Sequence, residues 1–170
     1  MKVTIYSIPS ANGLIAPTKE DDYGFITDQA WALYLKTLKK AGVFVMGRKT
    51  YEVSLRTGAF PYDCFNVVMT KQKFENKWAD KVIFSAQNPK QLLDSLSKKG
   101  FKQVIVTGGH LSSSFMKDKL VNELWLHLMP TVFANGINVF EGESFTANLK
   151  LFDLIQSAND EVLIKYKVRY

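Results

Sequence analysis

Residues 43–52 read Val43-Phe44-Val45-Met46-Gly47-Arg48-Lys49-Thr50-Tyr51-Glu52. The first four residues form a short, continuous apolar run, which is typical of a strand covered on both faces. Gly47 would end that strand, and a helix would begin at once with two cations and a hydroxyl. Glycine lets a ligand approach the backbone, and a helix N-terminus offers unpaired N–H groups and the positive end of its dipole. Arg48 adds a bidentate fork suited to phosphate, and Lys49 adds a point charge. The segment therefore favours an anion-binding turn, and a tight turn with two solvent-facing bases is the alternative.

A second segment, residues 103–112, shows the same order of features: Gln103-Val104-Ile105-Val106-Thr107-Gly108-Gly109-His110-Leu111-Ser112. An apolar strand again runs into glycines at an expected helix start. Paired glycines permit a backbone that approaches a pyrophosphate closely. The spacing differs from the Gly-x-Gly-x-x-Gly fingerprint, so an ordinary dinucleotide-binding domain of that type is not indicated. For this segment alone, a Gly-Gly turn without a ligand is the alternative.

Strand-like and helical segments alternate along the 170 residues. The patterns predict strands at 3–8, 43–46, 65–70, 82–84, 104–107, 123–129, 132–133, 149–155 and 161–170, and helices at 29–41, 49–55, 89–99 and 111–119. Early alternation of strand and helix predicts a largely parallel sheet, and the late run of strands predicts an antiparallel edge. We therefore expect one α/β domain over residues 1–170, a three-layer sandwich with a mostly parallel central sheet, an antiparallel C-terminal edge and flanking helices.

Three local features add detail to that prediction. Thr27-Asp28 supplies the N-cap of the helix at 29–41, and Gly42 supplies its stop. The last strand alternates apolar and polar side chains, which predicts one buried face. The loop between 9 and 25 is long and rich in small and polar residues, and loops of that kind often cover a site.

Composition limits the classes of site. The single cysteine, Cys64, excludes an intrachain disulfide framework and a Cys-rich zinc site, and with two histidines we expect no bound metal. The formal net charge is +6, but the lysines are scattered, which favours solvated faces over a nucleic-acid surface. The chain starts with a strand pattern and has no stretch of about 20 apolar residues. We therefore expect a cytoplasmic protein that binds neither nucleic acid nor membrane.

Taken in order, the two glycine-marked turns resemble the dihydrofolate reductase family and its relative, the reductase domain of riboflavin biosynthesis. The strongest stretch is 46–52, which looks like that family's Met-Gly-Arg-x-Thr segment, and the resemblance covers nearly the whole chain. It implies a dihydrofolate reductase-like fold and NADPH as the cofactor. The cofactor-binding positions that it implies are Ile15, Gly47, Arg48, Lys49, Thr50, Thr70, Lys71, Thr107, Gly108, Gly109, His110 and Leu111.

The resemblance also implies what several of these positions do. Arg48 and Thr50 would hold the NADPH phosphates, and Thr70-Lys71 would lie at the adenosine ribose and its 2′-phosphate. Gly108-Gly109 would pack against the pyrophosphate, and the loop that contains Ile15 would lie over the nicotinamide. His110 follows the glycines directly and would contact either the cofactor or solvent.

Other segments favour the riboflavin branch. Residues 10–16 look like its Ser-x-Asp-Gly-x-Ile-Ala loop, 120–126 like its Leu-Val-Asp-Glu-Leu-x-Leu signature, and 130–140 like its glycine-containing turn. Asn12 stands where that branch usually has Asp. Cys64 stands where folate reductases keep an Arg for the tail carboxylate of folate, which argues against folate as the natural substrate.

The substrate-binding residues implied by the resemblance are Asn12, Asp28 and Trp31. Residues 28–31 resemble the folate-reductase Asp-x-Ala-Trp segment, whose Asp binds the pterin ring and assists protonation, which would assign that role to Asp28. Capping of the helix by Thr27 or Asp28 is the alternative. His127 would share a strand face with Trp125 and point toward the substrate acid, and a structural or surface histidine is the alternative. Asp28 and His127 are thus the catalytic candidates.

These features favour an NADPH-dependent reductase of a small heterocyclic or imine substrate. The nearest specified reaction is that of 5-amino-6-(5-phosphoribosylamino)uracil reductase, and dihydrofolate reduction is the second enzymatic alternative. A non-catalytic NADP-binding protein and a basic nucleic-acid binder are the alternatives of other classes. The riboflavin-type resemblance also implies a homodimer, to which the apolar last strand could contribute an edge.

Overall fold

The computed structural model describes residues 1–17, 23–78, 80–157 and 159–170. Over these ranges strands and helices alternate at first, and the chain ends in strands. In chain order the elements are β1 (Lys2–Ser7), β2 (Leu14–Pro17), α1 (Asp28–Ala41), β3 (Val43–Gly47), α2 (Arg48–Arg56), β4 (Phe65–Met69), β5 (Val82–Ser85), α3 (Pro89–Lys98), β6 (Gln103–Thr107), α4 (Gly109–Lys117), β7 (Glu123–Leu128), β8 (Gly136–Asn138), β9 (Asn148–Gln156) and β10 (Val162–Arg169).

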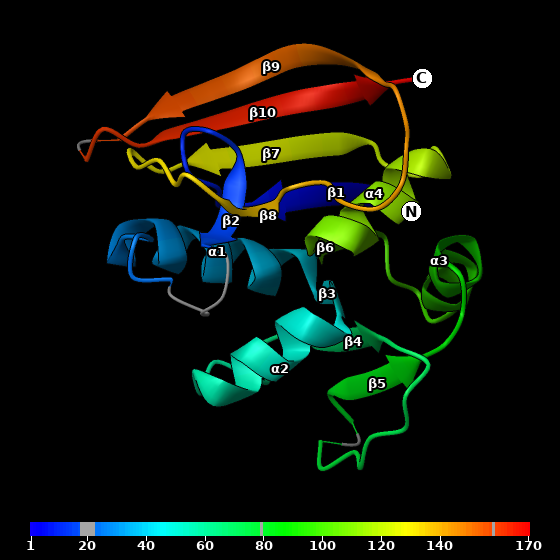
Figure 1. The fold of residues 1–170 in the computed structure, drawn as a ribbon. Coiled ribbons are helices and arrows are strands. Elements are labelled where there is room, and N and C mark those ends of the chain that lie inside the picture. Colours follow the sequence, from blue (N-terminus) through cyan, green and yellow to red (C-terminus); the bar gives the residue numbers. More distant parts are fainter. Residues whose placement is uncertain (18–22, 79, 158) are drawn as a thin grey trace.

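The main sheet is mostly parallel, which confirms the prediction (Figure 1). Its strand order is β5-β4-β3-β6-β1-β7-β10-β9. Every neighbouring pair from β5 to β7 is parallel, and β10 and β9 complete one edge in antiparallel orientation. From β3 the chain crosses to β4 on one side in the sheet, whereas from β6 it crosses to β7 on the other side. The connections therefore change direction at the β3–β6 pair. Open α/β sheets bind ligands at such a switch point, beyond the carboxyl ends of the strands.

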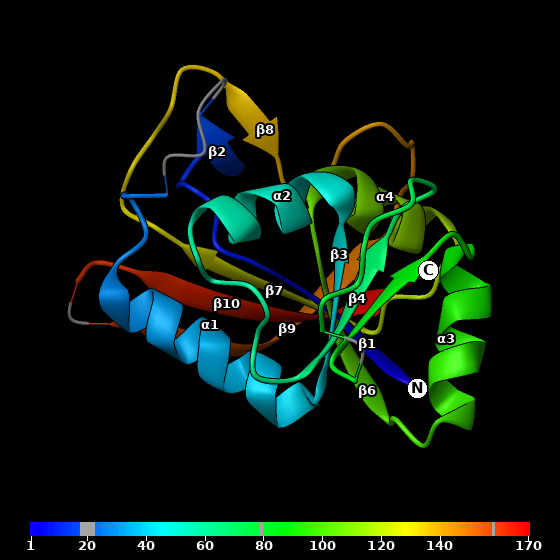
Figure 2. The same cartoon turned by 90° about the horizontal axis from the view of Figure 1, so that it is seen from below.

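Helices cover both faces of the sheet and make three layers (Figure 2). Neighbouring residues of β3 show the two interfaces. Phe44 packs in one buried cluster with residues of α1 and α2, and Val45 packs in the other with residues of α3 and α4. Both side chains are at most 1% exposed. The apolar run at 43–46 is therefore a strand covered on both faces, as its composition predicts. Among the described residues, no helix is long and apolar enough to cross a membrane.

Helix α1 begins and ends at its sequence signals. Thr27 Oγ1 accepts a hydrogen bond from Ala30 N at 3.1 Å, so Thr27 is the N-cap. Gly42 has a φ of 79°, and its N–H donates to Leu38 O at 3.0 Å. Glycine adopts this left-handed conformation without steric cost, which ends the helix. The capping role that the sequence left open between Thr27 and Asp28 belongs to Thr27.

Two short strands depart from the prediction. β2 lies inside the segment for which we expected a loop. Residues 132–133, for which we expected a strand, form none, and the strand that follows them is β8. β2 and β8 pair antiparallel in a separate small sheet (Figure 2). A Cβ at Gly136 would collide with Ala16 O, so this pairing depends on the glycine. Both strands are too short to show a period of two, which explains why the sequence did not indicate them.

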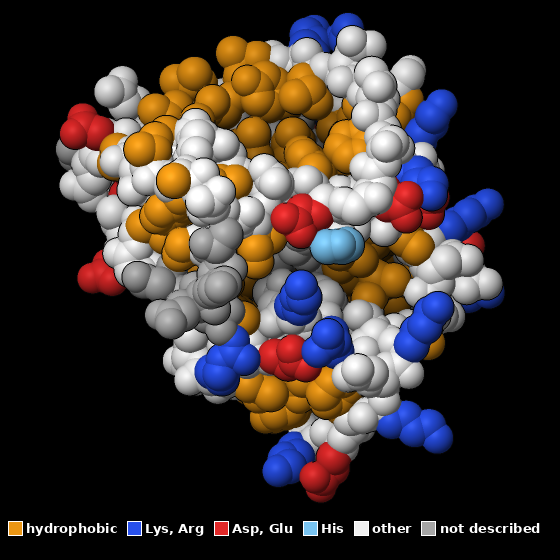
Figure 3. All heavy atoms as spheres, in the orientation of Figure 1, with side chains coloured by type: hydrophobic (Ala, Val, Ile, Leu, Met, Phe, Trp, Pro, Cys, Tyr) orange, Lys and Arg blue, Asp and Glu red, His pale blue; other side chains and the backbone are white. Residues whose placement is uncertain are grey.

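The C-terminal strands also differ from the prediction of a single buried face. Leu163 is buried in the cluster on the α1 side, whereas Tyr166 and Val168 pack against the cluster on the other side. β9 is the edge strand, and large apolar side chains on it are exposed: Leu149, Leu151, Phe152, Leu154 and Ile155. Figure 3 shows the apolar area over β9 and β10 at the top of the molecule.

Candidate active site

Two cavities meet at the carboxyl ends of β3 and β6. The first, which we call the cationic cavity, has a volume of about 620 Å³, and Arg48, Lys49 and Arg56 are part of its lining. The second, which we call the aromatic cavity, has a volume of about 340 Å³, and Trp31 and Tyr34 are part of its lining. The residues that line both cavities are Ile15, Tyr23, Thr50, Val53 and Gly108. The shared residues make the two cavities one continuous site.

The cationic cavity lies at two helix N-termini. β3 and β6 are parallel neighbours, with Met46 opposite Thr107, and each strand runs directly into a helix, α2 or α4. Neither N-cap, Gly47 or Gly108, makes a side-chain capping hydrogen bond. The first-turn N–H groups are thus open to an anionic ligand, and the helix dipoles favour negative charge there.

The charges around this cavity are mixed. Arg48 Nη1 lies 2.6 Å from Glu52 Oε1, one turn along α2, so the carboxylate orients the guanidinium. His110 Nδ1 lies 3.4 Å from Glu141 Oε2, and both residues line the cavity. Lys49 adds a further cation. The lining of the cationic cavity therefore carries a net positive charge, which the carboxylates of Glu52 and Glu141 reduce.

Gly108 and Gly109 are required for different reasons. Gly108 has a φ of 103°, which only glycine adopts readily. At Gly109 an added Cβ would lie 2.7 Å from Asn138 O and 3.1 Å from Glu141 Cγ. The end of β8 and the segment after it therefore pack directly on the start of α4, and Glu141 N donates to Gly109 O at 3.2 Å. Gly109 therefore has a packing reason of its own, and it also lines the cationic cavity.

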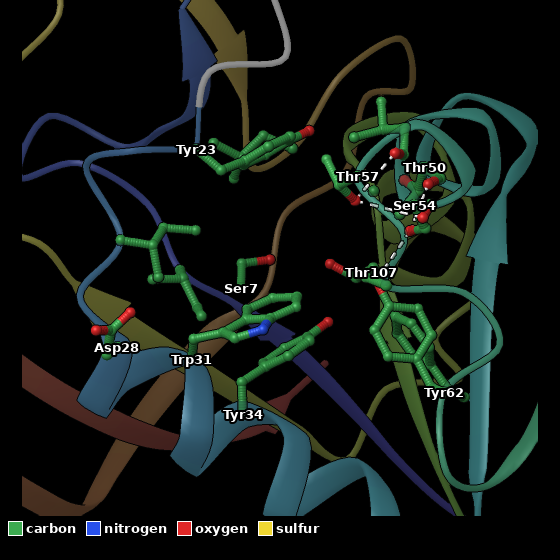
Figure 4. A pocket seen from close by; sticks show the side chains of 17 residues that line it. Ser7, Tyr23, Asp28, Trp31, Tyr34, Thr50, Ser54, Thr57, Tyr62 and Thr107 are labelled. Atoms are coloured by element: carbon green, nitrogen blue, oxygen red, sulfur yellow. Dashed lines mark hydrogen bonds between the residues drawn. The ribbon is translucent and has the colours of Figure 1, made fainter.

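The aromatic cavity has a wall of packed rings (Figure 4). Trp31 and Tyr34, one turn apart on α1, are stacked with centroids 5.5 Å apart and planes at 17°. Phe44 meets Tyr62 edge to face at 5.0 Å. Burial raises the pKa of both Tyr34 and Tyr62, so their hydroxyls stay neutral at ordinary pH. The Tyr62 hydroxyl lies 2.9 Å from Ser54 Oγ, which keeps that side of the cavity polar but uncharged.

Asp28 is exposed and lines the aromatic cavity. Figure 4 places it at the edge of the cavity, beside Trp31 at the start of α1. Because Thr27 caps the helix, the Asp28 carboxylate does not supply the cap. The structure therefore brings the two predicted residues Asp28 and Trp31 together at one cavity.

His127 lies in a buried polar network. Its side chain is 4% exposed, and its Nε2 lies 3.2 Å from Glu161 Oε2. Its Nδ1 lies 3.4 Å from the Tyr6 hydroxyl. Glu161 also accepts hydrogen bonds from Thr27 Oγ1 and from Ser157 Oγ. Burial lowers the pKa of His127, and the Glu161 carboxylate partly offsets that effect. Among the described lining residues of the two cavities His127 is absent, so its ring supports the start of α1 and does not face the cavities.

Asn12 likewise has a structural place. Its Nδ2 donates to Phe133 O at 2.8 Å, and its Oδ1 accepts from Ser10 Oγ at 2.8 Å. The amide thereby fastens the segment before β2 to the segment before β8. Asn12 is exposed and lies outside the described linings of both cavities, so the structure does not bring it to Asp28 and Trp31.

The remaining predicted cofactor residues gather at the cationic cavity or beside it. Those that line it are Ile15, Gly47, Arg48, Lys49, Thr50, Gly108, Gly109, His110 and Leu111, and Thr107 lines the aromatic cavity. Thr70 and Lys71 follow Met69, which lines the cationic cavity. Thr70 N donates to Ser85 O at 2.8 Å, and Lys71 is exposed.

Sequence reasoning missed several lining residues. Tyr34 follows Trp31 by three positions, and Ser54 follows Thr50 by four. Residues at these spacings share a helix face, so the helical period was the signal that could have found them. Tyr62 lies in a loop before β4 and carried no local signal.

Two further questions raised by the sequence concern the reactivity of Cys64 and the binding of a metal ion. Cys64 is half-buried, and burial raises the pKa of its thiol to about 12, so it is neither a thiolate nor a ready nucleophile. Within residues 1–17, 23–78, 80–157 and 159–170, no group of three or more His, Cys, Asp or Glu side chains could hold a metal ion.

Comparisons with known proteins agree with this geometry. The model of a protein family described as the RibD C-terminal domain matches residues 2–163. A protein of Shewanella sp. PV-4, described as a candidate riboflavin biosynthesis protein, has a similar structure with a TM-score of 0.83, at 19% identity and with 100% of each chain covered. RibD of Acinetobacter baumannii gives a TM-score of 0.78 at 18% identity over 99% of this chain and 58% of its own. The uncharacterized protein YwjB of Bacillus subtilis is 24% identical over 162 residues, 88% of each chain.

Proposed function

The chain belongs to the RibD C-terminal domain family, and from that premise we propose that it is an NADPH-dependent reductase of a small heterocyclic or imine substrate. One observation carries the proposal: a cationic cavity at two helix N-termini is continuous with an aromatic cavity that holds a carboxylate. A reductase needs this pairing, because a phosphate-rich cofactor and a planar substrate must meet at one place.

The residues of the cationic cavity fit NADPH. Arg48, Thr50 and the N–H groups at the start of α2 and α4 would hold its phosphates. Lys71, exposed directly after β4, would contact the 2′-phosphate that distinguishes NADPH from NADH. When bound, NADPH supplies a hydride, which is chemistry that side chains cannot provide.

The chain's own residues bind and orient the substrate and supply a proton. The ring wall of Trp31 and Tyr34 would orient a planar substrate and exclude water. Asp28 is the only carboxylate among the described lining residues of this cavity. It would deliver a proton to the substrate nitrogen, as a general acid positioned at the edge of the ring.

Cofactor binding tests the first half of the proposal. NADPH should quench tryptophan fluorescence, because Trp31 lies in the continuous site, and NADH should do so more weakly. Lys71→Ala should weaken NADPH at least tenfold and leave NADH nearly unchanged, whereas Lys73→Ala, an exposed lysine two residues further on, should change neither. An unchanged spectrum with both cofactors at near-millimolar concentration would rule out the reductase.

Turnover tests the second half. The decrease in NADPH absorbance should be followed with a panel of pterins, pyrimidines and dihydrofolate, including 5-amino-6-(5-phosphoribosylamino)uracil itself. Oxidation of NADPH with at least one ring compound is expected. Tight NADPH binding without turnover of any member would favour the non-catalytic NADP-binding alternative.

A further inference from the structure

The aromatic cavity differs sharply in charge from its neighbour. The cations of the site, Arg48, Lys49 and Arg56, line the cationic cavity. Among the described residues that line the aromatic cavity there is no Lys, Arg or His, and Asp28 is the one charged side chain. The cavity therefore combines a neutral interior with a negative edge.

The other polar side chains among the described lining residues are neutral: hydroxyls and the Trp31 indole N–H. Burial raises the pKa of Tyr23, Tyr34 and Tyr62, so these phenols do not ionise near pH 7. The Ser54 hydroxyl donates to Thr50 O at 2.8 Å and pairs with the Tyr62 hydroxyl. Hydroxyls in such a network can hydrogen-bond a neutral ring, but they cannot neutralise an ion.

An anionic group in this cavity would find no countercharge among the described lining residues. Burial of an unpaired charge costs several kcal/mol even after local relaxation. The Asp28 carboxylate would add repulsion rather than relief. Stacked rings such as Trp31 and Tyr34, by contrast, bind planar compounds through area and ring geometry, which need no charge.

We propose that the substrate taken by the aromatic cavity is an uncharged planar ring compound that carries neither a phosphate nor a carboxylate. This inference rests on the proposed function, because it takes the compound bound in the aromatic cavity to be the one that is reduced. It narrows the chemical class of that substrate. It separates the chain from enzymes whose pyrimidine substrate bears a ribosyl phosphate. The volume of about 340 Å³ lies near the lower end of the roughly 300–1,000 Å³ range of ligand pockets, which suits a ring system without a long extension.

The test compares pairs of related ring compounds of which one member carries an anionic group and the other does not. Hydroxymethylpterin and pterin carboxylate form one pair, and a ribosylaminouracil with and without its phosphate forms another. Binding is measured by ligand-observed NMR with and without NADPH. We expect the neutral member of each pair to bind at least tenfold more tightly. Equal or tighter binding of the anionic member would overturn the inference.

A designed variant tests the electrostatic cause. Thr57 lines the cavity, is exposed, and ends α2 with ordinary helical backbone angles. Lysine at a helix C-terminus is well tolerated, so Thr57→Lys adds a cation to the wall, and Thr57→Gln is the matched neutral control. The preference for the neutral ring should fall at least threefold in Thr57→Lys relative to Thr57→Gln. An unchanged preference would refute the electrostatic account.

The two proposals can fail separately. If NADPH does not bind, the proposed reductase fails, but the ring pairs measured without cofactor still decide the inference. If NADPH binds and the anionic rings are preferred, the reductase survives and the inference fails.

Discussion

The two glycines at the strand–helix junctions should respond very differently to alanine. At Gly109 the new Cβ would lie 2.7 Å from Asn138 O, a backbone atom that cannot rotate away. Overpacking of this kind costs about 1–3 kcal/mol. Alanine also restricts the unfolded chain, which returns about 0.4–1 kcal/mol. The expected net loss in the free energy of unfolding for Gly109→Ala is therefore about 1–2 kcal/mol.

Gly47→Ala is the matched control. A Cβ at Gly47 would meet no atom within 4 Å, and its φ of −83° suits any residue. The gain from a stiffer unfolded chain and the loss from a poorer N-cap, each about 0.5–1 kcal/mol, nearly cancel. We therefore expect the free energy of unfolding to change by no more than about 0.5 kcal/mol. Because Gly47 lines the cationic cavity, the same methyl should weaken NADPH binding.

Urea unfolding followed by far-UV circular dichroism measures both variants, with binding measured separately by fluorescence. A loss of about 1–2 kcal/mol corresponds to a fall in the melting temperature of a few degrees for a domain of this size. Equal stability losses in the two variants would refute the reasoning, because they would show that the contact with Asn138 does not decide the cost. A neutral Gly109→Ala would show that the segment after β8 can move away.

Four further predictions follow from other contacts. Asp28→Asn should lower kcat about 10²–10⁴-fold and change stability little, with Asp94→Asn on α3 as an exposed control; unchanged kcat would remove Asp28 as the proton donor. Thr27→Ala should cost about 1–3 kcal/mol, because both the cap and a donor to buried Glu161 are lost. Thr37→Ala on the same helix is the control: this half-buried hydroxyl only donates back to Leu33 O, so its loss should cost less than about 0.5 kcal/mol. Burial would raise the pKa of Glu123, but hydrogen bonds from Lys167 and Lys2 outweigh it and hold the pKa below the usual value. The carboxylate therefore adds stability above its unfolded pKa of about 4.3, and that stability is lost as pH falls through the lower folded value. The loss in the free energy of unfolding caused by Glu123→Gln near pH 7 should accordingly shrink below about pH 4. We also propose that the exposed apolar strand β9 pairs two copies of the chain: Leu154→Lys should shift sedimentation toward monomer and Leu35→Lys on α1 should not, and a monomeric wild type would contradict the dimer.

The residues that gather at the cationic cavity could be predicted because each part of that cavity is local. Residues 43–52 and 103–112 each contain a strand end, a glycine and a helix start, so one short segment specifies both the turn and its cations. The structure places the two segments side by side because β3 and β6 are neighbours in the sheet. Their order along the chain, together with the alternation of strands and helices, was enough to indicate the parallel sheet.

The aromatic cavity could not be predicted in the same way, because its wall comes from separate segments. Trp31 and Tyr34 lie on α1, Ser54 on α2, and Tyr62 in the loop before β4. No local pattern shows that Tyr62 will reach Phe44 and Ser54, since that contact depends on how the loop closes over the sheet. The charge asymmetry between the two cavities is likewise a property of the assembled site.

His127 shows how a correct local inference can still mislead about function. Strand alternation places it on the same face as Trp125, and the structure agrees, since Leu124 packs in the opposite cluster. What alternation cannot reveal is Glu161, which is fully buried against the His127 ring. Glu161 also accepts the hydrogen bond of Thr27, 134 residues away in sequence. Because Asp28 and Trp31 follow Thr27 on α1, a carboxylate near the end of the chain helps to fix where the substrate wall stands relative to the glycine turns. The position of Asp28 is thus set by long-range contacts, although the cationic cavity of the same site is set by local ones.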